Sequence, residues 1–135
     1  MTKPILCLDF DGVLHSYTSG WQGISVIPDP PVEGAIGFLW DAVEKFQVCI
    51  FSSRSSSPEG IAAMRQWLNH YDELYWEGLP ARPRTGLTLL IDFPTEKPAA
   101  FIGLDDRVLT FTGEFPSIDT LLKFQPWNKK PKGDG

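Results

Sequence analysis

Two pairs of acidic residues, each directly after a short apolar run, are the residues of this sequence whose types and spacing could do chemistry. Asp9 and Asp11 follow the run "ILCL", and Asp105 and Asp106 follow "AFIGL". In an extended chain, residues two apart point to the same side about 6.5 Å from each other, so Asp9 and Asp11 can share one ligand. Either pair alone is more often a turn or capping feature, but two pairs that each close a buried strand are a stronger signal.

The charge of these acids indicates what they would bind. Two carboxylates 4 Å apart repel by about 4 kcal/mol at an effective dielectric constant near 20, so several in one crevice need a cation. No Cys or His cluster accompanies the acids. Oxygen ligands alone favour magnesium over zinc. We therefore expect the four carboxylates to converge on Mg²⁺.

Polar residues at the end of a second apolar run, "VCIF", are candidates for binding a phosphate. Ser52 and Ser53 offer hydroxyl and backbone N–H donors, and Arg54 can grip two oxygens at once. The serines at 55–57 are better explained as a cap for the next helix. Lys97, in "PTEKPAA", could neutralise a phosphoryl group or a nucleophile, although such a lysine is usually a solvated surface charge. Gly12 lacks a Cβ, which would let the chain turn sharply and a substrate approach closely.

Apolar patterning predicts the elements that must position these residues. Continuous short apolar runs predict buried strands, and three- and four-residue apolar spacing predicts helices. The strands are expected at 4–9, 48–51, 73–76, 87–91, 100–104 and 108–112, and the helices at about 32–46, 58–70 and 117–124. Residues 13–31 read as an irregular flap. Alternating strands and helices predict an α/β fold with a mostly parallel sheet and helices on both faces, and ligands bind at the carboxyl ends of such strands.

Composition limits the class of protein. With 135 residues the chain fits one domain, which we place at 1–125, followed by a C-terminal tail at 126–135. No apolar stretch approaches the roughly 18 residues that span a bilayer, and the N-terminus lacks a secretory signal pattern, so we expect no membrane contact and a cytoplasmic location. Cys7 and Cys49 lie in apolar runs, where reduced buried thiols are expected. A net charge of -5 argues against non-specific nucleic-acid binding.

The ordered motifs resemble the haloacid dehalogenase-like (HAD) superfamily, on its phosphatase side. "DFDGVL" matches the family's first motif, Ser52 its second and "LDD" its fourth, with Lys97 as the candidate for the third. The match covers residues 5–107. It implies a three-layer, Rossmann-like sandwich whose flap at 13–31 is too short to be a separate cap domain. In the family, a missing cap goes with an open site that accepts large substrates or needs a partner to close it.

The resemblance also implies a role for each matching residue. Asp9 would be the nucleophile that forms an aspartyl-phosphate, and Asp11 would be general acid and then general base. Ser52 would bind the transferring phosphoryl group and Lys97 would stabilise its charge. Mg²⁺ would be held by Asp9, the backbone carbonyl of Asp11 and one of the late pair, with Asp106 as direct ligand and Asp105 as support.

Further similarities concern the substrate and the opening of the site. "SSR" is similar to the "SGR" of phage-type polynucleotide 3'-phosphatases, which makes Arg54 a phosphate contact and a nucleic-acid end a possible substrate, though the acidic charge does not favour one. His15, Tyr17 and Trp21 either line the opening or pack on the domain. The spacing of seven residues between Lys97 and Asp105 is shorter than is usual in the family.

Two alternatives to a magnesium-dependent phosphohydrolase stay open. One is a phosphate-binding or regulatory module that keeps the site without turnover. The other is a receiver-type phosphoacceptor domain, which is similar in size and binds magnesium. Motif order disfavours the receiver, because there the acidic pair opens the series, whereas here it closes the series. A dehalogenase is also less favoured, since those members usually lack a counterpart of Asp11 and a metal.

Overall fold

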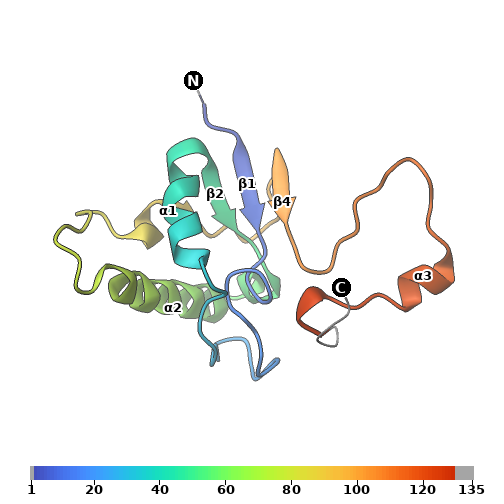
Figure 1. Cartoon of the computed structure of the whole chain (residues 1–135), viewed down its shortest axis with the longest axis horizontal. Helices are drawn as coiled ribbons and strands as arrows, with labels where there is room; N and C mark the ends of the chain where they lie inside the picture. Colours follow the sequence, from blue (N-terminus) through green and yellow to red (C-terminus); the bar gives the residue numbers. More distant parts are fainter. Residues whose placement is uncertain (1, 130–135) are drawn as a thin grey trace.

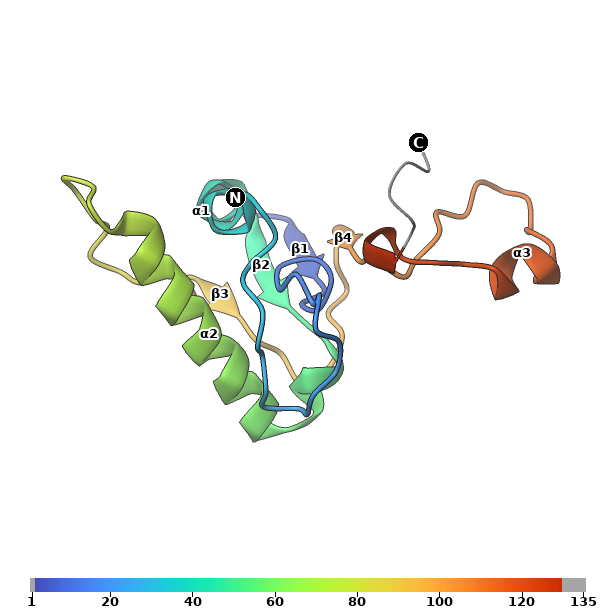
Figure 2. The ribbon, with the colours of Figure 1, turned by 60° about the horizontal axis from the view of Figure 1, so that its bottom comes forward.

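Four parallel strands form one sheet in the order β3-β2-β1-β4 in the computed structural model, which describes residues 2–129 (Figures 1 and 2). The strands are β1 (Ile5–Leu8), β2 (Gln47–Ile50), β3 (Ile91–Asp92) and β4 (Ile102–Leu104). β1 lies in the middle, where Leu6 pairs with Val48 on one side and Ile102 on the other. Because all the strands run the same way, their carboxyl ends meet at one edge of the sheet. The predicted parallel α/β sheet is confirmed.

The core lies between one face of this sheet and two helices, α1 (Ala35–Lys45) and α2 (Pro58–Trp76) (Figure 2). Alternate strand residues point to this face, as the period of two requires. The buried residues that meet there are Leu6, Leu8, Val48, Ile50 and Ile91 of the sheet, Ala35, Ile36, Leu39 and Ala42 of α1, and Met64, Trp67 and Leu68 of α2.

Local sequence explains where α2 begins, and Gly78, with a φ of +80°, lies just past the C-cap Glu77. The Ser57 hydroxyl accepts a hydrogen bond from the Gly60 N–H at 3.0 Å, and Pro58 occupies the first helical position, as predicted. The helix then runs to Trp76, so the strand predicted at 73–76 is wrong. Aromatic packing carries the helix through this segment, since the Trp76 ring meets Trp40 of α1 with centroids 5.6 Å apart.

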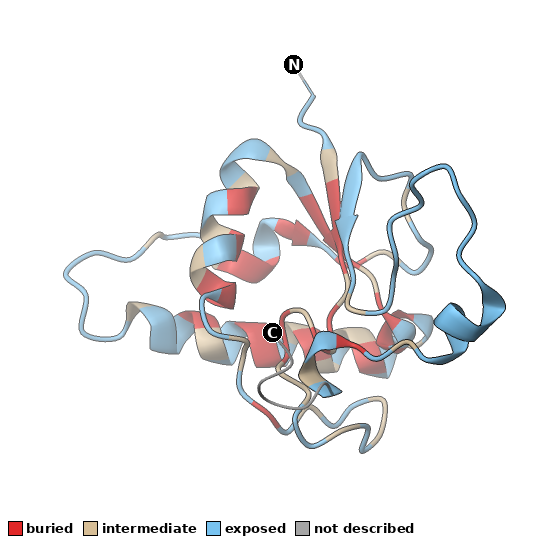
Figure 3. Cartoon of the chain, turned by 45° about the vertical axis from the view of Figure 1, so that its right-hand side comes forward, coloured by how far each residue is buried: buried red, intermediate tan, exposed pale blue. Residues whose placement is uncertain are grey.

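The predicted helical layer on the second face of the sheet is not found in the described residues. Both long helices cover the same face, and α3 (Ile118–Leu122) has no buried residue. Figure 3 shows the segment that carries α3 as an exposed excursion beyond the strands. Over residues 2–129 the fold is α/β, with a four-stranded parallel sheet and both long helices on one face. The strand predicted at 108–112 is also absent from the structure as described.

Short 3-10 helices and isolated bridges connect these elements. The 3-10 helices are η1 (Ser53–Ser56), η2 (Leu87–Leu89), which replaces most of the strand predicted at 87–91, and η3 (Trp127–Lys129). The flap at 13–31 is irregular, as predicted, and is fixed by single bridges from His15 to Asp11 and to Pro31. No helix in residues 2–129 is both long and apolar enough to cross a bilayer.

The start of the predicted tail contacts the domain. Pro126 is buried, and the Trp127 indole N–H donates a hydrogen bond to the Gly12 carbonyl at 2.8 Å. The rest of the tail, from residue 130, lies outside the described residues.

Candidate active site

Three of the four predicted acids lie together at the carboxyl edge of the sheet. Asp9 follows β1, and Asp105 and Asp106 follow β4, the strand that pairs with β1. Each of the three offers a carboxylate oxygen, and these oxygens lie within 4.8 Å of one another. The Asp9 N–H donates to the Leu104 carbonyl at 2.9 Å, which extends the strand pairing up to the acids. Parallel pairing therefore brings together residues almost a hundred positions apart.

Gly12 makes room for one of these acids. Its φ is +85°, a left-handed conformation that glycine adopts without strain. A Cβ at this position would overlap the Asp106 carboxylate. The sequence predicted that a substrate approaches Gly12 closely, whereas in the structure the close neighbour is the side chain of Asp106.

The neighbouring acids and burial change the titration of Asp9. Burial, opposed by the hydrogen bond from the Phe10 N–H and reinforced by the charges of Asp105 and Asp106, raises the pKa of Asp9 from 3.8 to about 7. Without a bound cation, Asp9 is therefore partly protonated near neutral pH, because ionising all three carboxylates brings three negative charges close together at a high cost in free energy. A divalent cation would relieve this repulsion.

The Asp106 carboxylate is a second feature that suits a bound cation. Its Oδ1 atom is buried and has no hydrogen-bond partner, which is costly for a carboxylate oxygen. Asp105 is more exposed, and its Oδ1 accepts a hydrogen bond from the Arg107 N–H at 2.9 Å. An all-carboxylate donor set with an unpaired buried oxygen fits a hard cation such as Mg²⁺.

Asp11, the fourth acid, turns away from this cluster and into a buried polar network. Both of its carboxylate oxygens accept hydrogen bonds from Arg54 Nε, at 3.1 and 3.3 Å, and its Oδ1 lies 2.8 Å from His15 Nδ1. Arg54 and His15 are both fully buried. Of the two alternatives for His15, lining the opening or packing on the domain, the structure has the second: its ring is packed inside the domain. The backbone carbonyl of Asp11 stays a predicted ligand.

Ser52 is placed beside the cluster but uses its hydroxyl within the protein. Its Oγ accepts from the Arg54 N–H at 3.0 Å, and its N–H donates to Ser55 Oγ at 3.0 Å, so Ser52 caps η1. The Ser52 O–H donates to Met64 Sδ at 3.6 Å, so it would have to turn away from Met64 to donate to a phosphoryl oxygen.

A cavity of about 660 Å³ joins the cluster to the remaining predicted residues. Asp9, Asp105, Ser52, Ser53 and Lys97 all lie on its wall. Lys97 is exposed on the loop between β3 and β4, and this loop brings it to the same cavity as the nucleophile candidate despite the short spacing to Asp105.

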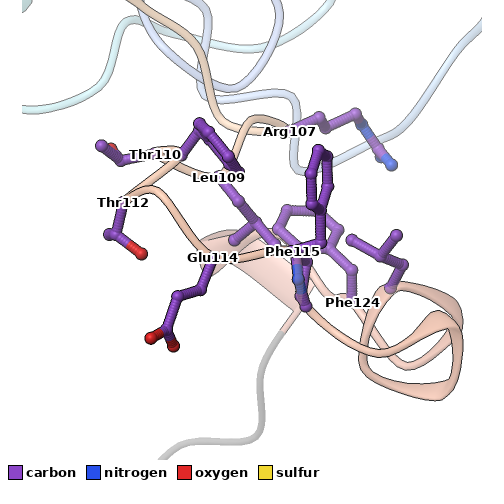
Figure 4. Close-up of a pocket in the computed structure, with 10 residues that line it drawn as sticks. Arg107, Leu109, Thr110, Thr112, Glu114, Phe115 and Phe124 are labelled. Atoms are coloured by element: carbon purple, nitrogen blue, oxygen red, sulfur yellow. The ribbon is translucent and has the colours of Figure 1, made fainter.

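A second hollow, of about 780 Å³, lies in the C-terminal excursion (Figure 4). Its walls are mainly apolar, with Phe111, Phe115, Leu121 and Phe124 among them. It holds one acid, Glu114, and none of the clustered carboxylates. This hollow is the larger of the two, but the clustered carboxylates lie at the sheet edge.

Two residues that contact the candidate site were missed by sequence reasoning. Trp127 bonds to the Gly12 carbonyl, and Asp29 donates its backbone N–H to His15 Nε2 at 3.1 Å. Neither has a sequence signal, because both contacts are tertiary and lie far from the motifs. Comparison of the chain with family models, curated proteins and solved structures found no match.

Proposed function

We propose that this chain is a magnesium-dependent phosphohydrolase that cleaves phosphomonoesters through an aspartyl-phosphate on Asp9. The observation that carries the proposal is the cluster of Asp9, Asp105 and Asp106, in which Asp9 has a raised pKa and Asp106 has an unpaired buried oxygen. Phosphoryl transfer needs positioning and charge neutralisation more than covalent machinery, and this edge of the sheet offers both.

In this proposal the residues of the chain catalyse two steps of phosphoryl transfer. A carboxylate oxygen of Asp9 attacks phosphorus, the bond from phosphorus to the ester oxygen breaks, and that oxygen takes a proton from Asp11. Water then attacks the phosphorus of the aspartyl-phosphate, Asp11 accepts its proton, and the Asp9 carboxylate leaves with its electron pair. Lys97, on the cavity wall, would neutralise charge on the phosphoryl oxygens. Mg²⁺, held by Asp9, Asp106 and Asp105, would neutralise developing negative charge.

A binding module without turnover is the second candidate, and one observation favours it. Asp11 and the Ser52 hydroxyl are both occupied by hydrogen bonds within the protein. A module that binds phosphate but leaves Asp11 in this network would keep the metal site and release no product.

Hydrolysis of p-nitrophenyl phosphate, with Mg²⁺ and with a chelator, distinguishes these candidates. We expect turnover only with Mg²⁺, and a loss of about 1,000-fold or more in Asp9→Asn, since the nucleophile is removed. Asp92→Asn is the matched control, because Asp92 also ends a strand but bonds to the Gln47 side chain outside the cluster. Wild-type rates in Asp9→Asn would refute the nucleophile, and Mg²⁺ binding without turnover would favour the module.

A further inference from the structure

Arg54 is a fully buried cation whose contacts all lie within the protein. On one side, its Nε and Nη2 atoms donate to the carboxylate of Asp11, with distances of 3.1 to 3.3 Å. On the other side, its Nη1 donates to the carbonyls of Gly23 and Ile24, at 2.9 and 2.8 Å. The guanidinium also lies 4.7 Å from the centre of the Trp21 ring. One side chain therefore joins the acid of the first motif to the tip of the flap.

These contacts leave little of the guanidinium for a substrate. Arginine has five N–H donors in a fixed planar fork, and here all three nitrogens already donate to Asp11 or to the flap carbonyls. In this arrangement Arg54 is a link between protein groups, rather than the phosphate contact that the sequence predicted.

His15 also bonds to the Asp11 carboxylate. Its Nε2 accepts the Asp29 backbone N–H, so the ring proton is on Nδ1, which donates to Asp11 Oδ1. The Asp29 carboxylate in turn accepts from the Ser19 N–H at 2.8 Å and from the Ser19 hydroxyl at 2.6 Å. The flap is thus bonded to Asp11 through His15 as well as through Arg54.

We infer that Arg54 is a positioning residue that fixes the carboxyl group of Asp11 and ties the flap at 13–31 to it, so that the flap and Asp11 move together. This inference rests on the proposed function, in which Asp11 protonates the leaving oxygen. A flap that closes over a bound substrate would then set the place of Asp11 at the same time, through Gly23, Ile24 and Trp21.

The dependence of kcat/KM on the leaving group tests this inference, because a merely structural role for Arg54 would lower kcat/KM equally for all esters. p-Nitrophenolate leaves with little help from an acid, whereas the alkoxide of glycerol 2-phosphate needs a proton. If Arg54 positions Asp11, Arg54→Lys lowers kcat/KM for glycerol 2-phosphate by about 100-fold and for p-nitrophenyl phosphate by no more than about tenfold. Lysine keeps the charge but cannot reach both Asp11 and the flap carbonyls with a planar fork.

Hydrogen exchange of the flap amides tests the second half of the inference without using activity. In the full-length Arg54→Lys variant we expect amides in residues 16–27 to exchange at least tenfold faster than in the wild type. Arg65→Lys is the matched control, because Arg65 also lies over an aromatic ring, that of Phe93, and donates to a backbone carbonyl, that of Thr88, away from Asp11. It should change neither the flap nor the ratio of the two esters.

Trp21→Leu keeps the inference testable if Arg54→Lys does not fold. Trp21 is half exposed, so its loss leaves the buried ion pair of Arg54 and Asp11 intact while weakening the hold on the flap. The same direction of change is expected, with a smaller size. Equal losses on the two esters, or flap exchange at the wild-type rate, would overturn the inference. If the wild type hydrolyses neither ester, the proposed function fails, while the exchange measurement still decides whether Arg54 holds the flap.

Discussion

Replacing Gly12 by alanine tests the geometry of the acid cluster, because the added methyl group enters the space of the Asp106 carboxylate. Gly34 provides a matched control: its φ is also +85°, and a Cβ there meets nothing within 4 Å. Forcing alanine into this left-handed conformation costs about 1–2 kcal/mol at either position. For a domain of this size we expect both variants to lose roughly 3–10 °C in Tm from this cause.

The two variants should differ in their response to magnesium. At ten times its Kd, Mg²⁺ stabilises the folded wild type by about 1.4 kcal/mol. If displacement of Asp106 weakens binding about tenfold, the same concentration stabilises Gly12→Ala by only about 0.4 kcal/mol. Gly34→Ala should keep the full effect, since Gly34 lies at the start of α1, away from the acids.

Thermal unfolding with and without Mg²⁺, supported by calorimetric titration, measures both effects. Equal magnesium stabilisation in Gly12→Ala and Gly34→Ala would refute the reasoning, because Asp106 would then not be a ligand that depends on the space at Gly12. A wild type whose Tm ignores magnesium would refute the metal site itself.

Three further predictions concern the same edge of the sheet. In a chelating buffer, the free energy of unfolding of the wild type relative to Asp9→Asn should fall as pH rises from about 4 to about 7. Burial and the acidic neighbours raise the folded pKa of Asp9 from 3.8 to about 7, so over this range the folded chain holds a proton that the unfolded chain has lost. Urea unfolding at several pH values measures this difference, and a difference that does not change with pH contradicts the prediction. Asp106→Asn should weaken Mg²⁺ binding at least tenfold and more than Asp105→Asn, since the Asp106 oxygen is the buried, unpaired one, and titration calorimetry that ranks them the other way would exchange their roles. Trp127→Phe should lower the free energy of unfolding by about 1 kcal/mol through loss of the bond to the Gly12 carbonyl, and an unchanged urea midpoint would show that water replaces it.

The parts of the fold that sequence predicted are those set by local pattern. β1 and β2 coincide with short continuous apolar runs, and the start of α2 has a serine cap followed by proline. The end of α2 was not predicted, because "ELYW" also suits a strand, although Gly78 just past the C-cap is a local signal for a helix end. The edge-to-face contact of Trp76 with Trp40 of α1 favours the helix, and this contact exists only in three dimensions.

In the candidate site, too, local sequence predicted some features, and others depend on tertiary packing. The position of each acidic pair directly after an apolar run predicted that four carboxylates meet at one edge, and the structure brings three of them, Asp9, Asp105 and Asp106, together. The direction of the Asp11 side chain could not be predicted, because it depends on Arg54 and His15, whose burial is a tertiary property. A burial that complete is rare for arginine, so a sequence alone favours a solvent-facing role for it.

The central place of β1 in the sheet has a consequence for synthesis of the chain. β2 and β3 follow β1 in the chain and lie on one side of it in the sheet, so these three strands can pair before β4 emerges from the ribosome. The other side of β1 stays unpaired until β4 emerges, and β4 is the strand that delivers Asp105 and Asp106. A nascent chain can therefore assemble most of its apolar interior before Asp105 and Asp106 arrive, so the cluster of three carboxylates forms only after the first three strands have emerged.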